Sequence, residues 1–244
     1  MKHQPRVALV TGANKGIGNE TATQRAKLGM TVLVGARDRE RGETAVAALR
    51  AQGGDCHLVL LDATDATSIA DAARVIERDI GRLDVLVNNA AIAKGVGPPP
   101  SAHSVAVMRE VFETNFFGVI ATTQALLPLL RRSPAARIVN VTTSVGSLGL
   151  AADYAHRIAQ QSIFFGYATS KTALNAFTVR LAYELRETAI KVNAGCPGYV
   201  ATDLNQHRGV RTVDEGAAII VRLATLPDDG PTGGFFDDAG RVPW

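Results

Sequence analysis

Tyr167 and Lys171 are the residues of this sequence best placed to do acid–base chemistry together. Within a helix, a spacing of four residues puts the phenol and the ammonium on one face. A free phenol has a pKa of about 10, which is too high for efficient proton transfer at neutral pH. Because a nearby cation favours the phenolate, we expect Lys171 to lower the pKa of Tyr167. Of the four tyrosines, only Tyr167 has a lysine four residues later.

A second chemical signal is the glycine-rich segment Thr11–Gly18, which follows a short apolar run and precedes a helical pattern. Glycine lets the backbone turn sharply and approach a phosphate without a clash from Cβ. The first turn of the helix offers free N–H groups and the positive end of the helix dipole. Between a first strand and a first helix, this pattern indicates a dinucleotide site. Its candidate binding residues are Gly12, Asn14, Lys15, Gly16, Ile17 and Gly18.

The residues after the second predicted strand select between the two nicotinamide cofactors. An acidic residue there binds the ribose 2′-hydroxyl of NAD, whereas an arginine suits the 2′-phosphate of NADP. Arg37 occupies this place, and Lys15 faces the same ribose. Arginine can hold a phosphate through two hydrogen bonds, and lysine adds a point charge. We therefore expect NADPH rather than NADH, and explain Asp38 as the cap of the following helix.

The Tyr167–Lys171 pair and the glycine-rich turn must be positioned by alternating strands and helices, and the sequence has that pattern. Several predicted strands are apolar throughout, as is typical of parallel strands buried on both faces. The predicted strands are 6–10, 31–35, 57–61, 84–87, 137–141 and 190–194, and the predicted helices are 16–28, 39–52, 66–80, 104–130, 167–187 and 214–226. This order predicts a single α/β domain over residues 1–244, with a three-layer, doubly wound parallel sheet of the Rossmann type.

Composition narrows the possible function classes. The 26 basic and 23 acidic residues give a net charge of +3 and are spread along the chain, which disfavours nucleic-acid binding. Two cysteines, Cys56 and Cys196, are too few for a disulfide framework, and no metal-ligand spacing surrounds them. The sequence has no apolar run long enough to span a membrane and no signal-peptide pattern, so the cytoplasm is the expected location.

Taken together, the motifs resemble those of the short-chain dehydrogenase/reductase family over nearly the whole chain. The matching residues are the Thr11–Gly18 turn, Asp62, Asn88-Asn89-Ala90, Asn115, the Thr142–Ser144 cluster, Tyr167 with Lys171, and Pro197-Gly198. Several independent motifs in the right order are far harder to obtain by chance than any one of them. The resemblance implies a reversible, NADPH-dependent reduction of a ketone or aldehyde to the alcohol.

The resemblance also implies a role for each matching residue. Tyr167 would protonate the developing alkoxide, and Lys171 would lower its pKa and bind the nicotinamide ribose. Asn115 would hold a water that links Lys171 to solvent, and Asp62 would bind the adenine amino group. The other implied cofactor contacts are Asn89 and Ala90 in the cleft, and Pro197, Gly198, Val200 and Thr202 beside the nicotinamide.

Two departures from the family pattern leave alternatives open. A serine usually binds the substrate carbonyl, and here Thr143 has its place, with Ser144 adjacent as the alternative. The gap between Thr143 and Tyr167 is longer than in most of the family. Its extra segment resembles a shorter form of an insertion that blocks a dimerisation surface in the carbonyl reductase branch. The chain therefore resembles that branch, and the choice between monomer and homo-oligomer stays open.

The sequence predicts the general character of the substrate but not its identity. The pocket would draw on residues 93–101, 148–165 and 204–213, and the apolar Ile163, Phe164 and Phe165 indicate a hydrophobic carbonyl compound. The polar segment 205–213 would be either a mobile lid or a plain loop.

Two other functions on the same fold stay open. One is a non-catalytic NADP-binding sensor or scaffold, and the other is a dehydratase or epimerase. The sensor would explain the glycine turn but gives no reason for Tyr167, Lys171 and Asn115 to occur together.

Overall fold

A single eight-stranded sheet organises the computed structural model, which describes residues 5–158 and 164–244. Its strand order is β3-β2-β1-β4-β5-β6-β7-β8, and every neighbouring pair is parallel except β7 with β8. The strands are β1 (Val7–Thr11), β2 (Thr31–Ala36), β3 (Cys56–Leu60), β4 (Val85–Asn88), β5 (Arg137–Val141), β6 (Lys191–Gly195), β7 (Phe235–Asp237) and β8 (Gly240–Arg241). The predicted doubly wound α/β fold is confirmed, with an antiparallel edge strand that was not predicted.

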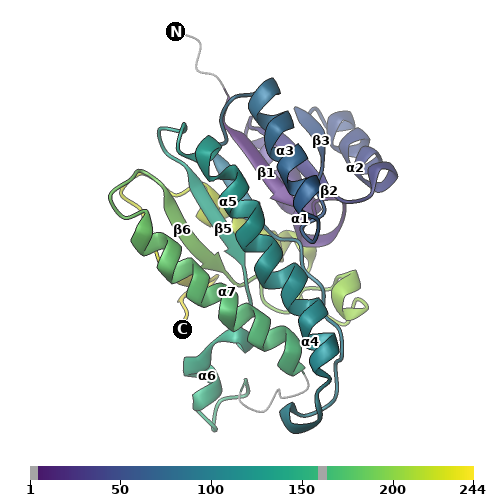
Figure 1. Cartoon of the computed structure of the whole chain (residues 1–244), viewed down its shortest axis with the longest axis vertical. Helices are drawn as coiled ribbons and strands as arrows, with labels where there is room; N and C mark the ends of the chain where they lie inside the picture. The colour runs from purple at the N-terminus through teal and green to yellow at the C-terminus, as the bar shows by residue number, and fades with distance from the viewer. Residues whose placement is uncertain (1–4, 159–163) are drawn as a thin grey trace.

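Helices cover both faces of the sheet and give the molecule three layers (Figure 1). They are α1 (Gly16–Lys27), α2 (Arg39–Ala51), α3 (Ala66–Asp79), α4 (Val105–Phe112), α5 (Gly118–Leu130), α6 (Leu148–Ala152), α7 (Phe165–Glu184) and α8 (Val213–Ala224). Helices α3, α5 and α7 pack on one face, and α1, α2 and α8 pack on the other. No helix in the described ranges is long and apolar enough to cross a membrane.

Strand β1 shows why the apolar runs do not alternate with polar residues. Val7 and Leu9 point into the core under α3, α5 and α7, while Ala8 and Val10 point into the core under α1, α2 and α8. Successive side chains of a strand point to opposite faces, so a strand covered on both faces must be apolar at every position.

The predicted helix over residues 104–130 is interrupted, which corrects the sequence-based expectation. Helices α4 and α5 are joined by a π-helical turn, Glu113–Phe117, that contains Asn115. A π turn inserts a residue into the helix while the chain stays helical, so a sequence pattern that predicts helix runs on through it.

The capping prediction for the second helix is confirmed, because Asp38 accepts a 2.9 Å hydrogen bond from Arg41 N at the start of α2. The C-terminal hairpin of β7 and β8 was not predicted as strands. Its strands have three and two residues, which is too short for a periodic pattern. The segment 205–213 folds back on Tyr199, whose carbonyl oxygen accepts hydrogen bonds from Val210 N and Arg211 N at 2.9 and 3.1 Å.

Candidate active site

The predicted site residues gather at the carboxyl ends of the parallel strands. The strand order reverses between β1 and β4, and ligands of doubly wound sheets bind at such a switch point. The glycine turn follows β1, Asn89 follows β4, Thr143 follows β5 and Pro197 follows β6. The topology therefore brings together motifs that lie far apart in the sequence.

The glycine turn has the geometry of a phosphate cradle. Gly12 and Gly16 have φ angles of +63° and +58°, which favour glycine. A Cβ on Gly18 would overlap Asn89 Nδ2 and lie 2.6 Å from the Gly12 carbonyl oxygen, so the turn is closely packed.

The first turn of α1 is left open to an anion. Side chains cap α2, α3, α4 and α8, whereas the N-cap residue of α1, Lys15, makes no side-chain capping bond and the first turn holds no acidic residue. Its N–H groups and the helix dipole are therefore available to a phosphate. This N-terminus fits the pyrophosphate of a dinucleotide.

Thr11 and Asn89 brace the cradle from the end of the sheet. Thr11 Oγ1 accepts hydrogen bonds from Asn89 N and Ala90 N at 2.9 and 3.0 Å. Asn89 Nδ2 donates to the carbonyl oxygens of Thr11 and Gly12 at 2.9 and 3.3 Å. The side chain of Asn89 thus holds the turn in place, and Thr11 has a supporting role that the sequence motif did not reveal.

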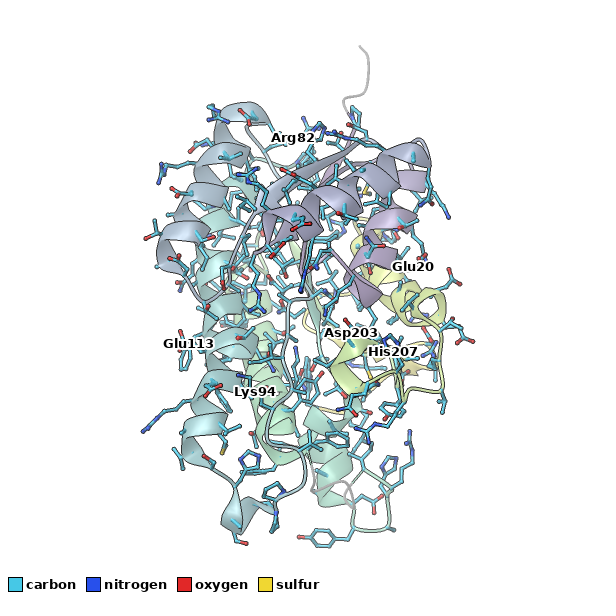
Figure 2. All side chains as sticks on the ribbon, turned by 90° about the vertical axis from the view of Figure 1, so that its right-hand side faces the viewer. Glu20, Arg82, Lys94, Glu113, Asp203 and His207 are labelled. Atoms are coloured by element: carbon cyan, nitrogen blue, oxygen red, sulfur yellow. The ribbon has the colours of Figure 1, made fainter. Side chains whose placement is uncertain are left out.

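The two predicted phosphate-binding cations have different surroundings. Lys15 Nζ forms a 2.6 Å ion pair with Asp203 Oδ2, and His207 Nε2 lies 2.8 Å from the other oxygen of Asp203 (Figure 2). Both neighbours hold the pKa of Asp203 below its usual value. Arg37 is exposed just beyond β2 and makes no hydrogen bond or ion pair within the described part of the chain. The cation most available to a ligand is therefore Arg37.

Asp62 lies just after β3, and one of its two carboxylate oxygens is hydrogen-bonded to Thr64. Burial alone would raise its pKa, but two hydrogen bonds from Thr64 and the charge of Arg37 lower it. Those bonds, 2.9 Å from Thr64 N and 2.7 Å from Thr64 Oγ1, both reach Oδ1. Asp62 is thus an ionised hydrogen-bond acceptor within the electrostatic influence of Arg37.

Lys171 lies on the same face of α7 as Tyr167, as the spacing predicted. Its Nζ lies 5.9 Å from the centre of the Tyr167 ring and donates a 2.8 Å hydrogen bond to the carbonyl oxygen of Val141. Burial lowers the pKa of Lys171 to about 7. Burial, with a smaller contribution from Cys196, raises the pKa of Tyr167 well above its usual value.

The expectation that Lys171 acidifies Tyr167 is therefore wrong for this structure. Desolvation penalises the charged form of both groups, and it is the main cause of both shifts. At neutral pH Tyr167 keeps its proton.

Asn115 lies fully buried in the π turn and joins two parts of the site. Its Oδ1 accepts from Ile92 N at 2.9 Å, and its Nδ2 donates to Ile92 O at 2.9 Å and to Ser170 Oγ at 3.1 Å. Ser170 Oγ in turn donates to the carbonyl oxygen of Tyr167 at 2.7 Å. The amide therefore ties the segment after β4 to the part of α7 that carries Tyr167, and its part in a proton relay stays a prediction.

Thr143 and Ser144 differ in what their hydroxyls contact. Thr143 Oγ1 accepts a long, 3.4 Å hydrogen bond from Val145 N, which leaves its own hydrogen available to a ligand. Burial raises the pKa of the Cys196 thiol, and the nearby Ser144 contributes a small opposing effect. The Thr143 hydroxyl is therefore free to donate, and Ser144 stays the alternative.

The segment after β6 lies against the glycine turn. Gly198 has a φ angle of +78°, and Val200 forms an isolated bridge with Arg211. A Cβ on Gly16 would meet the Thr202 methyl at 3.4 Å. Arg211, which the motifs did not single out, donates to the Pro197 carbonyl oxygen at 2.9 Å and also pairs with Asp238.

Part of the predicted substrate pocket is also placed. Phe165 begins α7 and packs edge-on against His103, with 5.8 Å between the ring centres, and Ile163 lies outside the described residues. Within the described residues, no group of three or more His, Cys, Asp or Glu side chains could hold a metal ion.

Comparison with known proteins identifies a consistent set of relatives. A sequence model of the short chain dehydrogenase family matches residues 6–211. The chain is 32% identical to (+)-neomenthol dehydrogenase of Capsicum annuum, with 95% of each chain covered. It is 34% identical to carbonyl reductase [NADPH] 1 of Mus musculus, with 98% of each covered.

Solved structures agree with these sequence matches. NADPH-bound carbonyl reductase from chicken fatty liver superposes with a TM-score of 0.85 at 28% identity, over 99% of this chain and 100% of that one. Salutaridine reductase from Papaver somniferum superposes with a TM-score of 0.83 at 32% identity, over 96% and 99% of the two chains.

Proposed function

This chain belongs to the short-chain dehydrogenase family, and on that premise we propose that it reduces a ketone or aldehyde to the alcohol with NADPH, in a reversible reaction. One observation carries the proposal. Tyr167 is a protonated phenol beside a buried lysine. It lies at the carboxyl ends of the parallel strands, as does the uncapped N-terminus of α1. Carbonyl reduction needs a proton donor and a dinucleotide-binding site close to each other.

NADPH supplies the hydride when it is bound. Tyr167 donates its proton to the carbonyl oxygen as negative charge develops there, and its raised pKa keeps that proton in place at neutral pH. Thr143 donates a hydrogen bond to the same oxygen, because its hydroxyl accepts a bond from Val145 N and keeps its own hydrogen free, with Ser144 as the alternative donor. Two fixed donors aimed at one oxygen stabilise the developing alkoxide.

Lys171 and Asn115 support this donor pair. The ammonium of Lys171 lies close enough to Tyr167 to stabilise a phenolate formed during proton transfer, and it binds the nicotinamide ribose. Asn115 orients α7 through Ser170 and takes part in the route by which a proton returns from solvent.

The preference for NADPH over NADH rests on Arg37 and Lys15. Arg37 is exposed and unpaired among the described residues, so it can hold the 2′-phosphate with two hydrogen bonds. Lys15 adds a second positive charge, shared with Asp203. The mouse and chicken relatives carry NADPH in their names, which supports the same preference.

The remaining cofactor contacts are assigned from the position of each residue around the switch point. Asp62 accepts from the adenine amino group, and Asn89 holds the glycine turn while Ala90 lines the cleft. The pyrophosphate lies on the first turn of α1, and the nicotinamide lies beside the segment after β6. The contacts on the two sides are Gly12, Asn14, Lys15, Gly16, Ile17 and Gly18 in the turn, and Pro197, Gly198, Val200 and Thr202 beyond β6.

The substrate is an apolar carbonyl compound. Exposed large apolar side chains occur in each of the three segments that follow β4, β5 and β6, namely Val96, Leu148, Tyr154, Tyr199, Leu204 and Val210. Where exposed apolar side chains form a contiguous patch they mark a binding surface, and we infer that these three segments supply one for the substrate. Relatives named for neomenthol and salutaridine support a bulky ketone.

Steady-state assays test the proposal directly. The purified chain is mixed with NADPH or NADH and with small, polar and bulky apolar ketones, and oxidation of the cofactor is followed by absorbance. We expect turnover with NADPH and with the bulky apolar ketones above all. Binding of NADPH without turnover of any carbonyl compound would contradict the proposal.

A further inference from the structure

The turn that carries Thr143 and Ser144 is tied to α7 at both of its ends by one side chain, Asn175. The Thr142 hydroxyl donates to Asn175 Oδ1 at 2.7 Å, and Asn175 Nδ2 donates to the Gly146 carbonyl oxygen at 3.2 Å. Thr142 and Asn175 are 1% and 4% exposed, so water competes with neither bond. The amide therefore closes a ring around the three residues between its two contacts.

Backbone bonds also hold the turn, such as the 2.8 Å bond from Thr142 N to the Gly195 carbonyl oxygen in β6, but its other side-chain bonds fix it to α7 less firmly. Thr143 Oγ1 is bonded within the turn itself, to Val145 N, at the long distance of 3.4 Å. Thr172 Oγ1 lies 2.9 Å from the Gly146 carbonyl oxygen and 3.1 Å from the Ala168 carbonyl oxygen, so its one hydrogen is shared between two acceptors. Asn175 is thus the described side chain that joins both ends of the turn to the helix.

We propose that Asn175 is a positioning residue that sets the Thr143 hydroxyl at the distance from Tyr167 that carbonyl reduction requires. This inference rests on the proposed function, in which both hydroxyls meet the same substrate oxygen. Tyr167 is carried by α7 and Thr143 by the turn after β5, so their separation is fixed only as firmly as the turn is fixed to the helix. Lys171 holds the end of β5 through Val141, and Asn175, one helical turn further on, holds the turn that leaves this strand.

A primary amide is the side chain that this position requires. It offers one acceptor, which faces a hydroxyl, and one N–H donor, which faces a carbonyl oxygen. In Asn175→Asp, a second carboxylate oxygen would face the Gly146 carbonyl oxygen and repel it. Asn175→Leu keeps the size of the side chain but leaves the Thr142 hydroxyl and the Gly146 carbonyl oxygen without this partner.

Four variants separate positioning from general stability. Asn175→Leu and Thr142→Val break the bridge from its two sides, whereas Thr142→Ser keeps the hydroxyl donor. Thr178→Val is the matched control. Thr178 lies almost one turn further along α7, is 0% exposed, and accepts a 2.9 Å hydrogen bond from Asn140 Nδ2 in β5, away from the turn.

We expect kcat of Asn175→Leu and of Thr142→Val to fall about 10- to 100-fold, because small misplacements of a catalytic group cost this much. The Kd for NADPH, measured by its fluorescence, stays unchanged. The isotope effect with deuterated NADPH rises, because hydride transfer becomes slower than product release. The double variant is no slower than the slower single variant, since both changes break one bridge. Thr142→Ser and Thr178→Val keep the wild-type kcat.

Two results would overturn the inference. One is a wild-type kcat in folded Asn175→Leu or Thr142→Val. The other is an equal fall of kcat in Thr178→Val, which would mean that the effect comes from a general loss of stability. A crystal structure of Thr142→Val adds a readout independent of turnover. A Thr143 hydroxyl in its wild-type place relative to Tyr167 overturns the positioning role, and a displaced hydroxyl supports it. An inactive wild-type enzyme would count against the proposed function, while this structural comparison would still decide the role of Asn175.

Discussion

Lys171 is bonded to Val141, with its Nζ 2.8 Å from the Val141 carbonyl oxygen, and the same nitrogen lies 5.9 Å from the centre of the Tyr167 ring. The lysine therefore does two things at once. It fastens α7 to the strand that leads to Thr143, and it places a titratable amine close to the Tyr167 ring. Burial shifts the pKa values of both groups, and the shift of Lys171 makes the stability of the fold depend on pH.

The stability of the protein is expected to rise with pH because of Lys171. Burial lowers the pKa of Lys171 from its ordinary value of 10.5, which holds in the unfolded chain, to about 7 in the folded chain. Between these values the unfolded chain binds a proton that the folded chain does not, so the free energy of unfolding increases with pH. Below the folded pKa both states are protonated and the contribution is constant. Each unit of pKa difference is worth ~1.4 kcal/mol.

Urea denaturation from pH 7 upward, with Lys171→Met as the reference, measures this contribution. The reference carries the same tyrosines and cysteines, so the difference between the two proteins isolates the lysine. Equal slopes of unfolding free energy against pH in both proteins would show that Lys171 is not discharged by folding.

Tyr167→Phe is expected to reduce turnover at least about 100-fold, the lower range for loss of a general acid. The Kd for NADPH should hardly change, because the hydroxyl faces the reacting oxygen in the proposed complex. Tyr183→Phe is the matched control, since Tyr183 is on the same helix and 64% exposed. Turnover in Tyr167→Phe equal to that of the control would remove the proton-donor assignment.

Much of the fold can be predicted from the sequence because its causes are local. The apolar strand β1 reports burial on two faces, and Asp38 caps α2 with its own side chain. The glycine turn also carries its own evidence, since its positive φ angles need glycine wherever the turn lies. These features act over a few residues, so a pattern of residue types is enough to find them.

The features that the sequence did not predict depend on long-range packing. The pKa of Tyr167 is raised mainly by burial, to which residues from distant parts of the sequence contribute, and less by Cys196. The ion pair of Lys15 with Asp203 joins residues 188 positions apart, and Asn175 meets Thr142 across 33. No spacing rule connects such pairs, because the topology of the sheet brings them together.

Arg37→Asp is expected to weaken NADPH binding about 10- to 100-fold and to leave NADH binding nearly unchanged. Hydrogen bonds to a charged group are worth ~1.5–3 kcal/mol, and the new carboxylate would repel the 2′-phosphate. Arg39→Asp is the control, because Arg39 pairs with Glu43 at 3.3 Å on the exposed surface of α2. Titration of both variants with both cofactors gives the ratio of affinities. Equal losses for NADPH and NADH in Arg37→Asp would contradict the phosphate assignment.

Asp203→Asn is expected to tighten NADPH binding, because it releases Lys15 for the 2′-phosphate. Both side chains are about half exposed, at 56% and 53%, and water and salt screen such a pair, so the gain is at most about fivefold. NADH, which lacks the phosphate, should bind as before. His207→Gln provides the comparison, since it removes the second neighbour of Asp203 but leaves the lysine paired. Weaker binding of both cofactors in Asp203→Asn would mean that the ion pair instead holds the loop over the cofactor.

Gly18→Ala is expected to weaken cofactor binding through the geometry of the cradle. The new methyl would overlap Asn89 Nδ2 and lie 2.6 Å from the Gly12 carbonyl oxygen, so the first turn of α1 must move away from the sheet. Gly29→Ala is the contrasting variant at the other end of the same helix. Gly29 has a φ angle of +75° and open space around it, so alanine there costs stability, ~1–2 kcal/mol, without touching the turn. NADPH affinity measured beside thermal stability separates the two, since Gly18→Ala should lose affinity and Gly29→Ala should keep it. Unchanged affinity in Gly18→Ala would show that the close packing of the turn is not what shapes the phosphate site.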